Sequence, residues 1–157
     1  MNTRGLLLFD IDGVIRDVEK SYRLAIQETV KNFCNWRPDI SDIDELKAEG
    51  IWNNDWDASM ELIKRHCQNN NNRSLIPHIQ ELIKVFNTYY FGDNQISKNQ
   101  HWTGFIKNEE LLVTNNFFNE LKKQGFSFGF VSGAEAISAK FVLETRLCLK
   151  NPPLIAM

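Results

Sequence analysis

The stretch Leu6–Gly13 decides the fold: it is Leu-Leu-Leu-Phe-Asp-Ile-Asp-Gly. Four consecutive apolar residues predict a strand buried on both faces, as strands of parallel sheets are. Asp10 and Asp12 follow at the carboxyl end of this strand, and Gly13 predicts the turn that ends it. Because ligands of open α/β sheets bind at the carboxyl ends of the strands, two carboxylates are expected at a ligand-binding edge.

A second apolar stretch predicts a neighbouring strand. Phe126–Val131 ends in Ser132 and Gly133, and the spacing of the apolar residues that follow is helical. Residues 152–157 have the pattern of a further strand. We predict that the first two strands are parallel neighbours with Asp10 and Ser132 at the same edge, because each is followed by a helical segment.

The sequence between the two strands is predicted to be helical. It is roughly 90 residues long, whereas ordinary βα connections have 2–6 residues, so it predicts an inserted unit. We assign residues 1–17 and 101–157 to an incomplete Rossmann-like α/β core and residues 18–100 to an all-helical cap. Ser41–Asp44 predicts a capping box at a helix start, and Gly92–Gly104 a connecting loop.

Composition excludes several classes of protein. The chain has 157 residues, 43% hydrophobic and 24% charged, which is typical of a globular domain with a small insertion. The longest apolar run falls far short of the ~18–20 residues of a membrane span. No signal-peptide pattern is present, so a cytoplasmic location is predicted. The net charge of −2 indicates neither a nucleic-acid nor a membrane partner.

The three cysteines, Cys34, Cys67 and Cys148, are odd in number and widely spaced along the sequence. They do not form a disulfide framework or a metal-binding pair of the Cys-x-x-Cys type. We predict buried thiols.

Asp10 and Asp12 suit two kinds of chemistry. Residues i and i+2 of a regular strand share a face, so the two carboxylates could bind a hard cation such as Mg²⁺. One carboxylate could also act as a nucleophile and the other as a general acid/base. Gly13 allows a phosphate to approach the backbone.

The segment Phe9–Asp17 resembles the first motif of the haloacid dehalogenase superfamily, Asp-x-Asp-Gly-x-x-x-Asp. The resemblance implies that Asp10 is the nucleophile that accepts a phosphoryl group. It implies that Asp12 is the general acid/base, and that Asp10 and the backbone carbonyl of Asp12 hold Mg²⁺. Ser132 and Gly133 resemble the second motif, which implies that they bind the transferring phosphoryl group.

The helical insertion is similar to the C1 cap of subfamily IA in that superfamily. Asn53, Asn54 and Asp55 are then candidate substrate contacts, the alternative being that they form a capped turn. The resemblance implies a Mg²⁺-dependent phosphatase that acts on a small phosphomonoester through an aspartyl-phosphate. Dehalogenase or phosphomutase chemistry is possible on the same scaffold, but the second Asp favours phosphoryl transfer.

The resemblance has one departure. The superfamily's third motif, a Lys, and its fourth, an acidic pair, do not follow Ser132; Lys140 and Lys150 are expected to be solvated. The chain is therefore expected to be a fragment of a longer protein or an impaired form that is marginally stable or aggregation-prone. A non-catalytic remnant that binds metal or a partner is the alternative. A signalling receiver domain is disfavoured because such domains lack a long helical insertion. A sugar-nucleotide transferase is disfavoured because its acidic motif would not lie so near the N-terminus, followed by Gly-Val.

Overall fold

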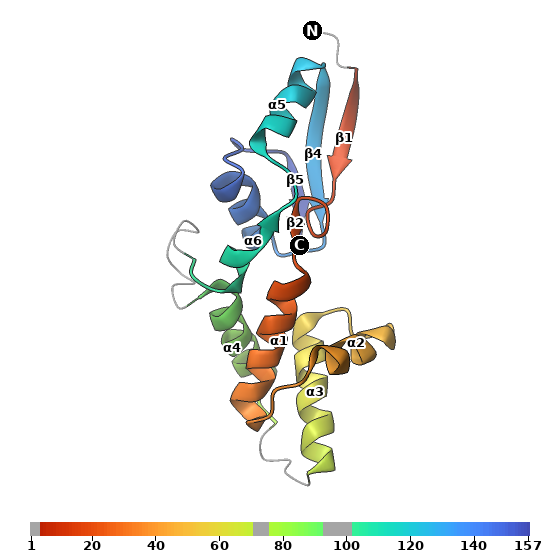
Figure 1. Ribbon diagram of the computed structural model, residues 1–157, viewed down its shortest axis with the longest axis vertical. Coiled ribbons are helices and arrows are strands. Elements are labelled where there is room, and N and C mark those ends of the chain that lie inside the picture. The colour runs from red at the N-terminus through yellow and green to blue at the C-terminus, as the bar shows by residue number, and fades with distance from the viewer. Residues whose placement is uncertain (1–3, 71–75, 93–101) are drawn as a thin grey trace. The chain divides into compact units, whose positions relative to one another are not determined.

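The computed structural model describes residues 4–70, 76–92 and 102–157, which form two units (Figure 1). The first unit contains residues 4–18 and 109–157. The second contains residues 19–70, 76–92 and 102–108.

A parallel sheet forms the centre of the first unit. Strands β1 (Gly5–Phe9), β4 (Phe126–Ser132) and β5 (Leu154–Ala156) are hydrogen-bonded in the order β1-β4-β5. Phe9 of β1 pairs with Phe130 of β4, and Phe130 pairs with Leu154 of β5. The predicted parallel pairing of the first two strands and the predicted third strand are confirmed.

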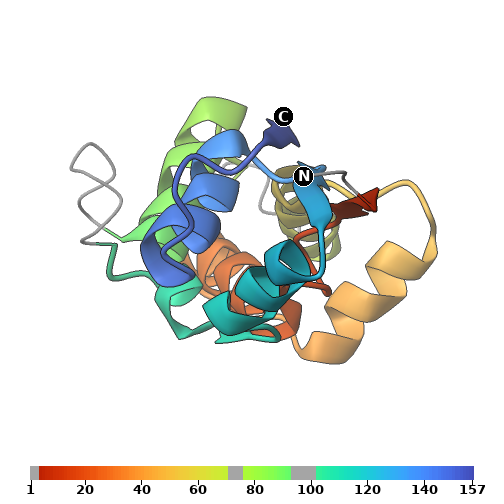
Figure 2. The same ribbon diagram turned by 90° about the horizontal axis from the view of Figure 1, so that it is seen from above.

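One face of this sheet is covered by helices. Helix α5 (Asn115–Lys123) precedes β4, and α6 (Ala136–Lys140) follows it and continues into a π-helical turn, η4 (Phe141–Arg146). Seen from above, these helices lie on the same side of the sheet (Figure 2).

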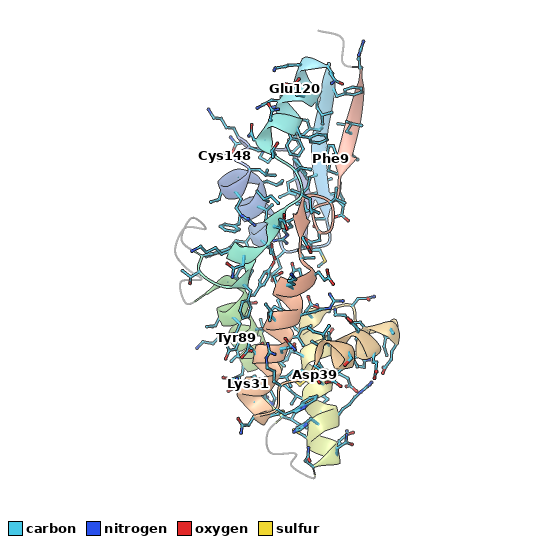
Figure 3. The ribbon with its side chains drawn as sticks, in the orientation of Figure 1. Phe9, Lys31, Asp39, Tyr89, Glu120 and Cys148 are labelled. Atoms are coloured by element: carbon cyan, nitrogen blue, oxygen red, sulfur yellow. The ribbon has the colours of Figure 1, made fainter. Side chains whose placement is uncertain are left out.

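Phenylalanine rings fill the space between α5 and the sheet. Phe9, labelled in Figure 3, meets the Phe118 ring edge-on with centroids 5.7 Å apart. Phe118 also contacts Phe128 at 4.9 Å and Phe130 at 5.5 Å, and it is fully buried. Edge-to-face aromatic packing of this kind is favourable beyond the burial of area.

The opposite face of the sheet is apolar and exposed. Leu6 and Leu8 of β1 are 65% and 64% exposed, and Ile155 of β5 is 72% exposed. The expectation that β1 is buried on both faces is therefore wrong for these residues. The reason is that no described element of this unit covers the face, whereas helices cover both faces of complete parallel sheets.

We expect this face to cause self-association, since contiguous apolar patches mark interaction or aggregation sites. Replacing Ile155 by Thr should weaken self-association roughly fivefold, because the lost apolar contact is worth about 1 kcal/mol. Sedimentation velocity at several concentrations measures the effect. The matched control is Ile51→Thr, because Ile51 is also 72% exposed but lies outside the sheet. Equal effects of the two substitutions would contradict the prediction.

A tight turn and a short ladder follow β1. The backbone N–H groups of Ile15 and Arg16 donate to the Ile11 carbonyl at 2.8 and 3.1 Å, and the Gly13 N–H donates to the Arg16 carbonyl at 2.8 Å. Gly13 has φ 76°, a conformation that glycine adopts without strain. Strand β2 (Arg16–Asp17) then pairs antiparallel with β3 (Glu110–Leu111). No pattern in the sequence predicted this ladder.

The second unit is helical. It contains α1 (Glu19–Cys34), α2 (Ile40–Ala48), α3 (Asp55–Asn69), α4 (Ile79–Phe91) and the 3₁₀ turn η3 (Phe105–Asn108). Its core consists of small and aliphatic side chains with some aromatic rings. Fully or almost fully buried members are Ala25, Ile26, Val30, Ile43, Ala58, Ile63, Leu82 and Phe86. No helix among the described residues is long and apolar enough to span a membrane.

Two local expectations for this unit need correction, and a third falls mostly outside the described residues. The capping box is formed by Asp39 and Asp42 rather than by Ser41–Asp44, since Asp39 is the extended residue before α2. Asp39 is labelled in Figure 3. Residues 102–108, assigned to the core by sequence, group with the helices because the Trp102 ring packs 4.4 Å from that of Phe91. Most of the predicted loop Gly92–Gly104 lies outside the described residues.

The cysteines follow the prediction in part. Cys34 at the end of α1 and Cys67 near the end of α3 are buried, with their sulfur atoms 4.0 Å apart. Burial, and secondly the neighbouring Cys67, raise the pKa of Cys34 to about 12. Cys148 is exposed, so the prediction of a buried thiol is wrong there.

Candidate functional site

Asp10 and Ser132 lie at the same edge of the sheet. Asp10 directly follows β1, is exposed, and accepts the Ile11 N–H at 2.6 Å through Oδ1. Since Phe9 pairs with Phe130, the continued register places Asp10 beside Val131 and one residue from Ser132. The prediction that Asp10 and Ser132 stand at the same edge of the sheet is therefore confirmed.

The turn after β4 presents Ser132 and Gly133. Ser132 is buried at the end of the strand, and its Oγ accepts the Ala134 N–H at 3.1 Å. Gly133 is exposed, and open space lies where a Cβ would be. This turn thus combines a hydroxyl group with an accessible stretch of backbone, which suits the binding of an anion.

Asp12 is held by an arginine that the sequence analysis did not single out. Arg16 Nε donates to Asp12 Oδ1 at 2.7 Å, and the two residues also form a backbone bridge. The Asp12 side chain is 29% exposed, whereas that of Arg16 is completely buried. The second carboxylate of the motif is therefore paired with a cation that solvent does not reach.

Arg16 belongs to a buried polar network. Its Nη1 donates to Glu109 Oε2 at 2.8 Å, and its Nη2 donates to Ser138 Oγ at 2.9 Å. Burial lowers the pKa of the nearby Arg146, an effect that Glu109 opposes and Arg16 reinforces. Arg16 is inside the recognised motif, but nothing in the sequence linked it to Glu109, which is 93 residues away.

Glu135 is a further titratable group near this edge. It precedes α6, three residues after Ser132, and burial raises the pKa of its carboxyl group. Groups with shifted pKa values are common at functional sites. A glutamate next to a serine-glycine turn carried no distinctive signal in the sequence.

The oxygen donors at this edge are of the kind that Mg²⁺ prefers. Among the described residues, no group of three or more His, Cys, Asp or Glu side chains could hold a metal ion. However, Mg²⁺ is usually bound by one or two carboxylates together with waters and substrate phosphate. The Asp10 carboxylate and the Asp12 backbone carbonyl are a chemically suitable, minimal donor set.

Two lysines follow Ser132 in the sequence, Lys140 and Lys150, and both are exposed. Lys140 is exposed at the end of α6. Lys150 lines a cavity of about 300 Å³ with Phe126 and Pro153, at the amino end of β4 and therefore opposite to Ser132. Lys150 is accordingly no substitute for the third-motif lysine.

The three candidate substrate contacts lie in the helical unit. Asn54 caps α3, since its side chain accepts the N–H groups of Trp56 and Asp57, and Asp55 pairs with Lys47 at 2.7 Å. Asn53 is exposed. The capped turn is thus confirmed for Asn54, and contact of these residues with a substrate stays a prediction.

Glu49, Trp52 and Arg65 form an exposed hydrogen-bonded cluster, in which Trp52 directly precedes Asn53 in the sequence. Hydrogen bonds from Arg65 and then from Trp52 lower the pKa of Glu49 to about 2. Any stability that Glu49 contributes is present above its unfolded pKa and is lost as the pH falls toward 2.

No protein-family model matches the sequence. An imidazoleglycerol-phosphate dehydratase from Phytophthora nicotianae is 30% identical over 118 residues, which are 75% of this chain and 24% of that protein. The chain therefore spans about a quarter of the length of this relative.

Two solved structures resemble the chain. The phosphatase Tt82 from Thermococcus thioreducens is 21% identical with a TM-score of 0.73, covering 96% of this chain and 72% of that one. A haloacid dehalogenase-like family hydrolase from Xanthomonas campestris is 13% identical with a TM-score of 0.50, covering 100% of this chain and 64% of that one. The chain therefore has the α/β fold of haloacid dehalogenase-like hydrolases.

Proposed function

We propose that the chain belongs to the haloacid dehalogenase superfamily and acts as a Mg²⁺-dependent phosphatase on a small phosphomonoester. The observation that carries the proposal is the parallel pairing of β1 and β4, which brings Asp10 and Ser132 to one edge. Of the two solved structures described above, one is named a phosphatase and the other a haloacid dehalogenase-like hydrolase. A cytoplasmic location and a cap role for the helical unit, of which residues 19–70, 76–92 and 102–108 are described, are part of the same proposal.

In this proposal Asp10 is the nucleophile. Its carboxylate is exposed at the strand end, and the Ile11 N–H bound to Oδ1 orients it. The other carboxylate oxygen attacks phosphorus, the bond to the leaving alcohol breaks, and an aspartyl-phosphate forms. Ser132 Oγ and the backbone at Gly133 bind the oxygens of the transferring group. The Asp10 carboxylate and the Asp12 backbone carbonyl would hold Mg²⁺, which would supply neutralisation of negative charge.

Asp12 is the general acid/base. It protonates the leaving alcohol in the first step and removes a proton from the water that hydrolyses the aspartyl-phosphate in the second. The position of Asp12 two residues after Asp10, in the turn beside the sheet edge, supports this division of roles.

Replacing Asp12 by Asn should slow turnover about 10²–10⁴-fold, the usual contribution of a general acid/base. An activated aryl phosphate has a good leaving group, so the first step suffers less than the second and the phosphoenzyme should accumulate. Intact-mass spectrometry after acid quenching detects it as the mass of one added phosphoryl group. The control is Asp57→Asn, an exposed aspartate in the first turn of α3.

The wild-type chain itself tests the proposal when it is assayed with an aryl phosphate and millimolar Mg²⁺. Turnover that EDTA abolishes and Mg²⁺ restores is expected. A chain that binds Mg²⁺ in calorimetry and turns over nothing would refute the phosphatase and favour a non-catalytic metal-binding protein.

A further inference from the structure

We propose that Arg16 is a positioning residue that fixes the carboxylate of Asp12, and that Glu109 and Ser138 in turn fix Arg16. The inference rests on the proposed role of Asp12 as the acid/base. It adds residues from two distant segments of the chain to that site.

The first observation is the burial of Arg16. Its guanidinium group is completely excluded from solvent, and a buried cation is costly unless its donors are satisfied. Nε, Nη1 and Nη2 donate to three different side chains at 2.7, 2.8 and 2.9 Å. Because guanidinium is planar and its donors have a fixed geometry, these bonds together define one orientation of the group.

The second observation is that the partners differ in exposure. The side chain of Glu109 is fully buried, whereas that of Asp12 is 29% exposed. Glu109 neutralises Arg16 inside the protein, and Nε donates to the partly exposed carboxylate of Asp12. Asp12 is therefore held through Oδ1 by a group that cannot itself move toward solvent.

The third observation is that the backbone reinforces this arrangement. The Arg16 N–H donates to the Ile11 carbonyl, and the Gly13 N–H donates to the Arg16 carbonyl. Arg16 also pairs with Leu111 in the β2–β3 ladder. This pairing brings Glu109, which directly precedes β3, close to Arg16. The turn that carries Asp12 is thus tied to Arg16 through both main chain and side chain.

Orientation matters for an acid/base because misplacement by about 1 Å can cost a hundredfold in rate. Without Arg16 the Asp12 side chain would sample other rotamers. The expected consequence is a lower kcat, with little change in KM because substrate binding depends on Ser132, Gly133 and the metal rather than on the Asp12 side chain.

The test compares Arg16→Lys, Arg16→Met and Glu109→Gln in the full chain with an aryl phosphate. We expect kcat to fall about a hundredfold in Arg16→Met and about tenfold in Arg16→Lys and Glu109→Gln, with KM within about threefold. The control, Arg65→Met, removes an exposed arginine that pairs with Glu49 and Glu61, and its kcat should be unchanged. If Arg16 has a purely structural role, the substitutions would lower the melting temperature and the fraction of folded protein. The kcat per folded molecule would then not fall more in Arg16→Met than in Arg16→Lys and Glu109→Gln.

A second measurement does not depend on activity. Crystal structures of the wild-type chain and of Arg16→Lys show whether the Asp12 side chain changes its rotamer, and Glu109→Gln serves if an Arg16 variant does not fold. A changed or disordered Asp12 supports the inference, even if the wild-type chain proves inactive and the phosphatase proposal fails. An unchanged Asp12 rotamer, or kcat values within twofold of wild type in an active chain, would overturn it.

Discussion

Replacing Asp10 by Asn should reduce phosphatase turnover by at least about 10⁴-fold, as loss of a catalytic nucleophile does in well-studied hydrolases. An amide oxygen lacks the charge that makes the carboxylate nucleophilic, so no aspartyl-phosphate can form at a useful rate. The fold should persist, because Asp10 is exposed and the amide oxygen can still accept the Ile11 N–H.

The measurement is steady-state turnover of an aryl phosphate, with the melting temperature recorded for the same samples. Asp57→Asn makes the same chemical change at an exposed position on α3 and should leave both values unchanged. Wild-type turnover in Asp10→Asn would show that another group attacks phosphorus, and the assignment of the first motif would have to be abandoned.

Replacing Phe118 by Ala should destabilise the α/β unit by about 3–5 kcal/mol, the range measured for buried phenylalanines. Phe118 is fully buried and contacts the rings of Phe9, Phe128 and Phe130 on two strands. Its removal leaves a cavity at the point where α5 is attached to the sheet. Because small domains are marginally stable, a loss of this size is enough to unfold much of the protein at 37 °C.

Urea unfolding, followed by circular dichroism, measures this effect. The matched control is the preceding residue, since Phe117 is on the same helix but is 40% exposed. Phe117→Ala should cost less than half as much. Equal costs would mean that the packing of Phe118 against the strands does not dominate the stability of this unit.

The candidate nucleophile was predictable because its signal is local. Leu6–Phe9 has the composition of a strand in a parallel sheet, and Asp10, Asp12 and Gly13 follow at the point where such strands present ligands. Phe126–Gly133 likewise has the composition of a buried strand that ends in polar and small residues. Two strands that are each followed by a helix pair in parallel, so their pairing could be predicted without coordinates, and it is observed.

Other features depended on contacts between residues far apart in the sequence. No periodicity links Arg16 to Glu109 and Ser138, 93 and 122 residues away, and only folding brings these side chains together. The closeness of Cys34 and Cys67 is similar, because it results from the packing of α1 against α3.

The sequence by itself determined the two main strands, Leu6–Phe9 and Phe126–Val131, the helical character of most of the segment between them, and which carboxylates stand at a strand end, since these properties follow from neighbouring residues. The tertiary structure alone decided which partner each buried polar group has. It also decided that Leu6 and Leu8 are exposed, although their composition predicts burial. Whether a residue is buried depends on which elements pack against it. The hydrophobicity of a side chain gives only its tendency to be buried.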